Sequence, residues 1–79
     1  MLYGIDFYNG EYILKRKEAN EDRWWYLQSF RQSGQCHATW TGVKEQAWPR
    51  KYYEVADILK WFIDRNPHLV TNVLVEIDD

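Results

Sequence analysis

Residues 2–17, LYGIDFYNGEYILKRK, predict a β-hairpin, the clearest element of the fold. Asn9-Gly10 is a residue pair that readily adopts the positive φ angles of a type I′ turn, and an apolar run flanks it on each side. A two-residue loop sets the register of the two strands and makes Ile5 face Leu14. One face of the resulting hairpin is then apolar, with Tyr3, Ile5, Phe7, Tyr12 and Leu14. The other face is mostly polar, with Gly4, Asp6, Ile13, Lys15 and Lys17.

A second hairpin is expected from Arg23 to Phe30 and from Cys36 to Thr41, closed near Ser33-Gly34. With a two-residue loop, Leu27 faces Trp40 and Ser29 faces Ala38. One face then alternates small and large side chains, as a core requires: Trp25, Leu27, Ser29, Cys36, Ala38 and Trp40. The opposite face carries Trp24, Tyr26, Gln28 and Phe30 beside His37, Thr39 and Thr41. An antiparallel sheet covered on one side should be polar on the other, so this second aromatic face is unexpected.

The second half of the chain adds one helix and one strand. Apolar residues recur at helical spacing from residue 52 to residue 65, at Tyr52, Val55, Ala56, Leu59, Phe62 and Ile63. Asn66-Pro67 ends this helix, because proline cannot continue the hydrogen-bond ladder. The run from Leu69 to Ile77 is typical of a strand, and residues 43–48 either continue the fourth strand or form a loop. The order β-β-β-β-α-β predicts an α+β fold, a mainly antiparallel sheet of four to five strands with one helix on one face.

Length and composition narrow the class of protein. We expect residues 1–79 to form a single α+β domain, since so short a chain cannot build two cores. Cys36 is the only cysteine, which excludes an internal disulfide and favours a reducing, cytoplasmic environment. No signal peptide or membrane-spanning stretch is expected. The net charge of −2 gives no global attraction to nucleic acid or acidic lipid.

Little in the sequence is typical of an enzyme or a metalloprotein. The candidate metal ligands are Cys36, His37 and His68, but neighbours on a strand point to opposite faces. The same geometry keeps His37 from acting as the base that would activate the Cys36 thiol. The four glycines stand singly and form no phosphate-binding loop. We therefore expect no catalytic residue, no metal and no cofactor.

The aromatic face of the second hairpin is the feature most suggestive of function. It brings Trp24, Tyr26 and Phe30 close to three cationic or titratable residues, Arg23, Arg31 and His37. Trp, Tyr and Arg dominate the energetics of protein interfaces, which favours a protein partner or self-association as a homodimer. Single-stranded nucleic acid stacked on the same rings is the alternative, with few cations to support it. A third interpretation is structural: residues 43–51 fold over this face with Trp48 as its cover.

Three short motifs follow one another in the middle of the chain. Trp40-Thr41, Ala47-Trp48 and the helix start at residues 53–56 resemble a loose pattern in small phage- and prophage-encoded proteins. In that pattern the helix opens on Glu-Ala, and this chain departs from it with Glu54-Val55-Ala56. The resemblance covers residues 37–62 and carries over no functional residue. It implies a helper or inhibitor protein without assigned catalytic residues, in line with the non-catalytic binding domain that the residues themselves indicate.

Overall fold

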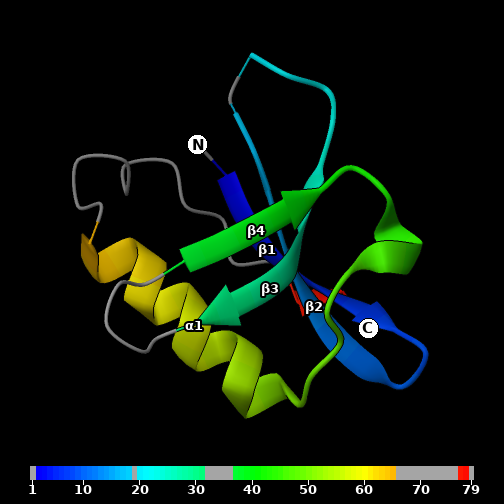
Figure 1. Ribbon diagram of the computed structural model, residues 1–79, viewed down its shortest axis with the longest axis vertical. Helices are drawn as coiled ribbons and strands as arrows, with labels where there is room; N and C mark the ends of the chain where they lie inside the picture. The colour runs from blue at the N-terminus through cyan, green and yellow to red at the C-terminus, as the bar shows by residue number, and fades with distance from the viewer. Residues whose placement is uncertain (1, 19, 32–36, 66–76, 79) are drawn as a thin grey trace.

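The computed structural model describes residues 2–18, 20–31, 37–65 and 77–78 (Figure 1). Its elements are β1 (Leu2–Tyr8), β2 (Glu11–Lys17), β3 (Trp25–Arg31), β4 (His37–Thr41), the 3-10 helix η1 (Lys44–Gln46), α1 (Tyr52–Arg65) and β5 (Ile77–Asp78). The strands form a sheet in the order β4-β3-β2-β1-β5. All neighbours are antiparallel except β1 and β5, which are parallel. The helix packs on the sheet, which confirms the predicted α+β fold.

The first hairpin has the predicted register. Asn9 and Gly10 have φ angles of 50° and 82°, both positive as a type I′ turn requires. Ile5 faces Leu14 across the two strands, as expected from the two-residue loop. The pairing places Tyr3, Ile5 and Leu14 on one face of the hairpin, where they join the core with α1.

The strands β2 and β3 pair at one end only and then diverge. Lys15 faces Tyr26 and Arg16 faces Trp25, and residues 48–50 lie between the strands beyond these pairs. The Trp48 amide donates to the Leu27 carbonyl at 2.8 Å on the β3 side. On the β2 side, Tyr12 and Arg50 exchange two backbone hydrogen bonds, each 2.9 Å long. The segment thus pairs backbone groups that the divergence would otherwise leave unsatisfied.

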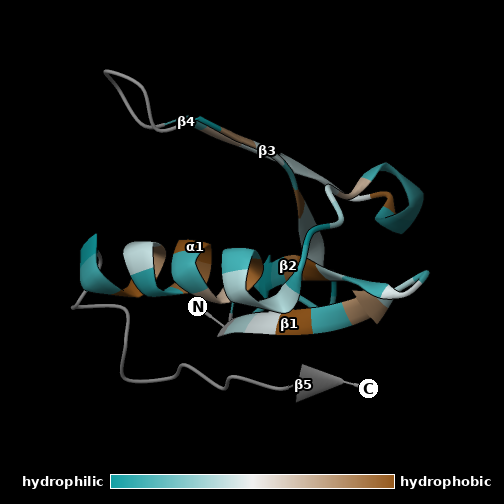
Figure 2. Ribbon diagram, turned by 90° about the horizontal axis from the view of Figure 1, so that it is seen from below, coloured by the Kyte–Doolittle hydropathy of each residue, from teal (hydrophilic) through white to brown (hydrophobic). Residues whose placement is uncertain are grey.

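The divergence bends the sheet around the helix. In Figure 2, β3 and β4 rise away from the layer formed by β1 and β2, and α1 lies in the angle between them. The core fills this angle with the side chains of Tyr3, Ile5, Leu14, Leu27, Val55, Ile58, Leu59 and Phe62. The predicted helix positions Val55, Leu59 and Phe62 are therefore confirmed as core residues, whereas Tyr52 at the start of α1 is exposed.

The second hairpin departs from its predicted register inside β3. Leu27 faces Trp40 as expected, but an irregularity between Leu27 and Ser29 shifts the pairing beyond it by one residue. The pairs that follow are Ser29–Thr39, Phe30–Ala38 and Arg31–His37. One extra residue in one strand is a β-bulge, and it exchanges the two faces of that strand from there on. The predicted Ser29–Ala38 pair was therefore wrong.

Parts of three predicted features lie outside the described residues. These are the turn at Ser33-Gly34, the helix stop at Asn66-Pro67 and residues 69–76 of the last predicted strand. Ile77 lies within the described residues and, with Asp78, forms β5 beside β1.

Replacing Gly10 by Val should destabilise the protein by about 1–3 kcal/mol, because a β-branched residue is strained at a positive φ. An added Cβ at Gly10 would meet no atom within 4 Å, so backbone strain alone causes the loss. Asn9→Gly is the matched control and should change stability far less, since glycine adopts a positive φ readily. Chemical denaturation measures both variants. Equal unfolding midpoints for Gly10→Val and the wild type would contradict the turn type.

Candidate functional site

Residues 41–47 cover part of the sheet face opposite α1. Ile13 in β2 and Ala47 after η1 are buried, with 0 % and 7 % of their surface exposed. The Thr41 hydroxyl donates to Gln46 Oε1 at 3.0 Å and accepts from the Val43 amide at 3.2 Å, which fixes the turn into η1. The stretch left open by the sequence is thus a covering segment with a 3-10 helix. The face predicted as mostly polar contains a buried isoleucine.

An ion cluster fastens this covering segment to the sheet. Lys44 Nζ lies 2.8 Å from Asp6 Oδ2, and Lys15 Nζ lies 3.9 Å from the same oxygen. The Phe7 amide donates to Asp6 Oδ1 at 2.9 Å. Burial opposes ionisation of the Asp6 carboxyl, but the hydrogen bond from Lys44 and the charges of Lys15 and Lys44 outweigh it and lower the pKa of Asp6. Asp6 is therefore an ionised anchor that ties η1 to β1.

Two of the predicted partner-binding residues, Trp24 and Tyr26, lie on this same face and are half-buried. Lys15 Nζ and Lys17 Nζ lie over the Trp24 ring, 4.5 and 5.0 Å from its centroid. Tyr26 faces Lys15 in β2 on one side and β4 on the other. Because two ammonium groups lie over the Trp24 ring, less of its surface is available for stacking on a base or a partner side chain.

Phe30 lies on the helix side, which corrects its predicted place beside Trp24. The bulge turns its ring toward α1, where it makes edge contacts with Trp61 at 5.2 Å and Phe62 at 5.9 Å between centroids. Trp25, expected in the core, is half-buried and is not among the described core residues. Its ring lies 4.4 Å from the Arg23 guanidinium.

The last two predicted residues, Arg31 and His37, face each other at one end of β3 and β4, and both are exposed. The six predicted residues are therefore distributed over separate places. Trp24 and Tyr26 share the face opposite α1, Phe30 contacts α1, and Arg23 stacks on Trp25. The structure does not gather them into one surface.

An aromatic surface that the sequence reasoning missed lies where the first hairpin meets the start of α1. The rings of Phe7 and Tyr12 are 5.7 Å apart, and those of Tyr12 and Tyr52 are 5.3 Å apart, both in edge-to-face contact. Phe7 and Tyr52 are 43 % and 40 % exposed. These three residues are termed the aromatic patch. Beside it, the Arg50 guanidinium stacks on Trp48 at 4.1 Å.

Part of the aromatic patch can be predicted from the sequence. The hairpin register places Phe7 opposite Tyr12, as the structure confirms. Helical spacing predicts Tyr52 on the buried stripe of α1, whereas the structure leaves it exposed. It reaches Tyr12 because Arg50, two residues earlier, pairs with Tyr12. That bridge joins distant parts of the chain and has no local sequence signature.

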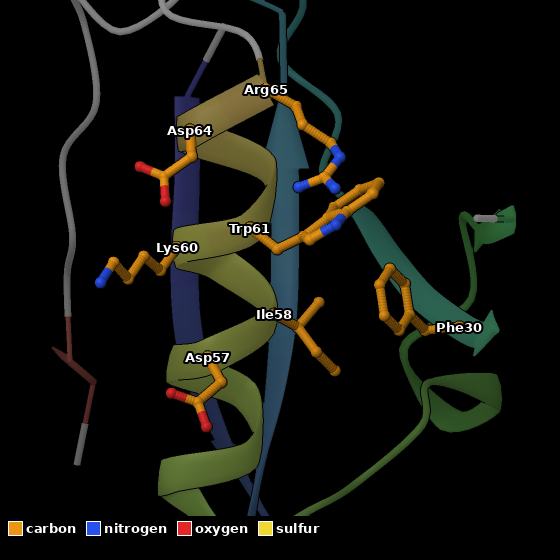
Figure 3. Close-up of a pocket in the computed structure, with 7 residues that line it drawn as sticks. All are labelled: Phe30, Asp57, Ile58, Lys60, Trp61, Asp64 and Arg65. Atoms are coloured by element: carbon orange, nitrogen blue, oxygen red, sulfur yellow. The ribbon is translucent and has the colours of Figure 1, made fainter. Parts of the chain in front are cut away.

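A pocket of about 260 Å³ lies between α1 and β3. Its lining residues are Phe30, Asp57, Ile58, Lys60, Trp61, Asp64 and Arg65 (Figure 3). Figure 3 shows Trp61, Ile58 and Arg65 on the side of α1 that faces Phe30, whereas Asp57, Lys60 and Asp64 point to the other side. Arg65 stacks on Trp61 at 4.3 Å, and the buried Trp61 indole N–H has no hydrogen-bond partner among the described residues. The side of the pocket between α1 and β3 is therefore lined mainly by aromatic and aliphatic side chains, and its carboxylates point away from that side.

Among the described residues, no three His, Cys, Asp or Glu side chains come together in a group able to hold a metal ion. The candidate ligands Cys36 and His68 are outside this part of the chain. In the same part, no helix has the length and apolar character needed to cross a membrane.

Comparisons of the chain with protein-family models, curated proteins and solved structures gave no match. The fold and the surface define the class on their own: a small α+β protein with a bent sheet, one packed helix and exposed aromatic side chains.

The β3 bulge leads to a prediction about Phe30 and Trp25. Phe30→Ala removes a ring that contacts α1 and should cost about 2–4 kcal/mol of stability. Trp25→Ala removes a half-buried ring outside the described core and should cost only about 1 kcal/mol. Urea unfolding of both variants measures the difference. A larger loss for Trp25→Ala would favour the register without a bulge.

The ion cluster predicts a specific acid sensitivity. The folded-state pKa of Asp6 is lowered from its usual 3.8, so its contribution to stability is present above about pH 4 and is lost as pH falls through the folded-state value. Asp6→Asn removes this contribution, so its melting temperature should fall less between about pH 5 and about pH 2 than that of the wild type. Asp57→Asn, an exposed carboxyl on α1, is the control. Parallel acid profiles for wild type and Asp6→Asn would rule out the anchoring role.

Proposed function

We propose that this protein is a non-catalytic binding domain whose partner is another protein. The aromatic patch carries the proposal. Two of its residues, Phe7 and Tyr52, remain about two-fifths exposed, although each carries a large ring. Rings gathered at a surface, rather than scattered singly, mark interaction sites, because a partner can remove their apolar area from water.

The composition and order of the patch support protein binding. Tyr12 and Tyr52 belong to the residue types enriched at the centres of protein interfaces, as do the neighbouring Trp48 and Arg50. Each tyrosine offers an apolar ring and a hydroxyl that can hydrogen-bond to a partner. The edge contacts between successive rings hold them in place before binding. Less side-chain entropy is then lost when the complex forms.

The kind of partner is suggested by the middle of the chain. The resemblance of residues 37–62 to small phage- and prophage-encoded proteins favours a partner that the protein inhibits or assists. The face of Trp24 and Tyr26 with its neighbour Arg23 is the second candidate surface for such a partner. We rank it below the aromatic patch, because lysines lie over the Trp24 ring and both aromatic side chains are half-buried.

Single-stranded nucleic acid is the alternative partner, and one observation favours it. Cations lie over aromatic rings along β2 to β4, with Lys17 at Trp24 and Arg16 at Trp40, the latter 4.5 Å from the ring centroid. Base stacking needs an open ring face beside such cations. The net charge of −2 gives no long-range attraction to phosphate. We therefore propose a protein partner as the principal function.

Affinity capture tests the proposal. Tagged wild-type protein in a lysate of its native host should retain a protein that mass spectrometry identifies, and the purified partner then allows titration. Tyr52→Ala should weaken binding by about 2 kcal/mol or more, as for an interface hot spot. Its melting temperature should change little, because Tyr52 is exposed. Trp24→Ala is the matched control and should bind as the wild type does.

Two outcomes would contradict this assignment. If Trp24→Ala abolishes binding and Tyr52→Ala does not, the contact surface is the Trp24 and Tyr26 face. If the captured molecule is a single-stranded nucleic acid whose affinity falls steeply with salt concentration, the alternative function replaces protein binding.

A further inference from the structure

Strand β4 forms one edge of the sheet, with β3 as its only strand neighbour among the described residues (Figure 1). One side of its backbone is therefore left without a strand partner there. Natural edge strands usually carry a lysine, a proline or a bulge that prevents further pairing. The sequence of β4, His37-Ala38-Thr39-Trp40-Thr41, contains no proline, lysine or acidic residue, and the bulge of this hairpin lies in β3. Over the described residues, its outer edge therefore presents unpaired backbone groups that can pair with another strand.

We infer that β4 pairs antiparallel with β4 of a second copy of the chain, across a two-fold axis at Thr39. If all five residues pair, the middle residue lies on the axis and Thr39 faces its own counterpart. Ala38 then faces Trp40 of the other copy. Both side chains pack on the α1 side of the sheet, so the small alanine leaves room for the large indole. Threonine pairs across strands are favourable, and no like charges meet at neutral pH.

The dimer extends the proposed function without depending on it. The first hairpin, which holds Phe7 and Tyr12, lies on the far side of β3 from the paired edge, since the strand order is β4-β3-β2-β1-β5. Both aromatic patches therefore stay accessible in the dimer. Two linked copies of one contact surface raise the apparent affinity for a repeated or dimeric partner.

Opposite charges at the axis test this pairing. Thr39 is exposed, so Thr39→Lys and Thr39→Glu should both keep the circular dichroism spectrum of the wild type. Sedimentation equilibrium should show a dimer for the wild type. Each charged variant should dissociate about tenfold or more readily, because like charges meet across the axis. An equimolar mixture of the two variants should form the dimer again.

Ser29→Lys is the matched control. Ser29 faces Thr39 from β3 and is also exposed. In the dimer the two introduced lysines would be three strand spacings apart, about 14 Å, which exceeds the screening length of about 8–10 Å at physiological salt. This variant should dimerise as the wild type does. The inference fails if the wild type is monomeric at every soluble concentration, if the mixture does not restore the dimer, or if Ser29→Lys disrupts it as strongly as Thr39→Lys.

Discussion

The bend of the sheet depends on the two backbone hydrogen bonds that Tyr12 and Arg50 exchange. These bonds satisfy the backbone groups of Tyr12 in β2 beyond the point where β3 diverges. On the β3 side, the Trp48 amide donates a hydrogen bond to the Leu27 carbonyl. The sheet can therefore bend without leaving buried backbone groups unpaired, and α1 packs into the bend. Tyr52 follows Arg50 by two residues, so the same bridge brings the Tyr52 ring into contact with Tyr12. The packing of α1 and the aromatic patch thus both depend on the bridge between Tyr12 and Arg50.

Cations over aromatic rings are the second recurring device of this chain. Each of the five tryptophans has a lysine or arginine over its ring, at distances from 4.1 to 5.0 Å: Trp24, Trp25, Trp40, Trp48 and Trp61. Each contact of this kind contributes about 0.5–1 kcal/mol at exposed sites. The core is too small to bury every indole, and a lysine or arginine therefore covers part of each half-buried ring. Because these basic side chains contact the rings, they are less available to bind phosphates.

The sequence predicted those elements whose determinants are local. Asn9-Gly10 specifies the turn and register of the first hairpin, and the spacing of Val55, Leu59 and Phe62 specifies the buried stripe of α1. The bulge after Leu27 has no such signature, since it accompanies a bond from Trp48 some twenty residues later. Placing Phe30 on the wrong face followed directly from that omission. The aromatic patch was missed for a similar reason, because it joins a hairpin to a helix through tertiary contacts.

The bridge between Tyr12 and Arg50 also predicts an order for the steps of folding. The first hairpin needs only neighbouring residues, so Phe7 and Tyr12 meet as soon as it closes. Tyr52 joins them only after the chain closes the long loop between residues 12 and 50, which is slower because non-local contacts must first overcome loop entropy. The complete patch therefore exists only in the finished fold. A partner that contacts all three rings would distinguish folded copies from partly folded ones, and its binding would shift the population toward the native state.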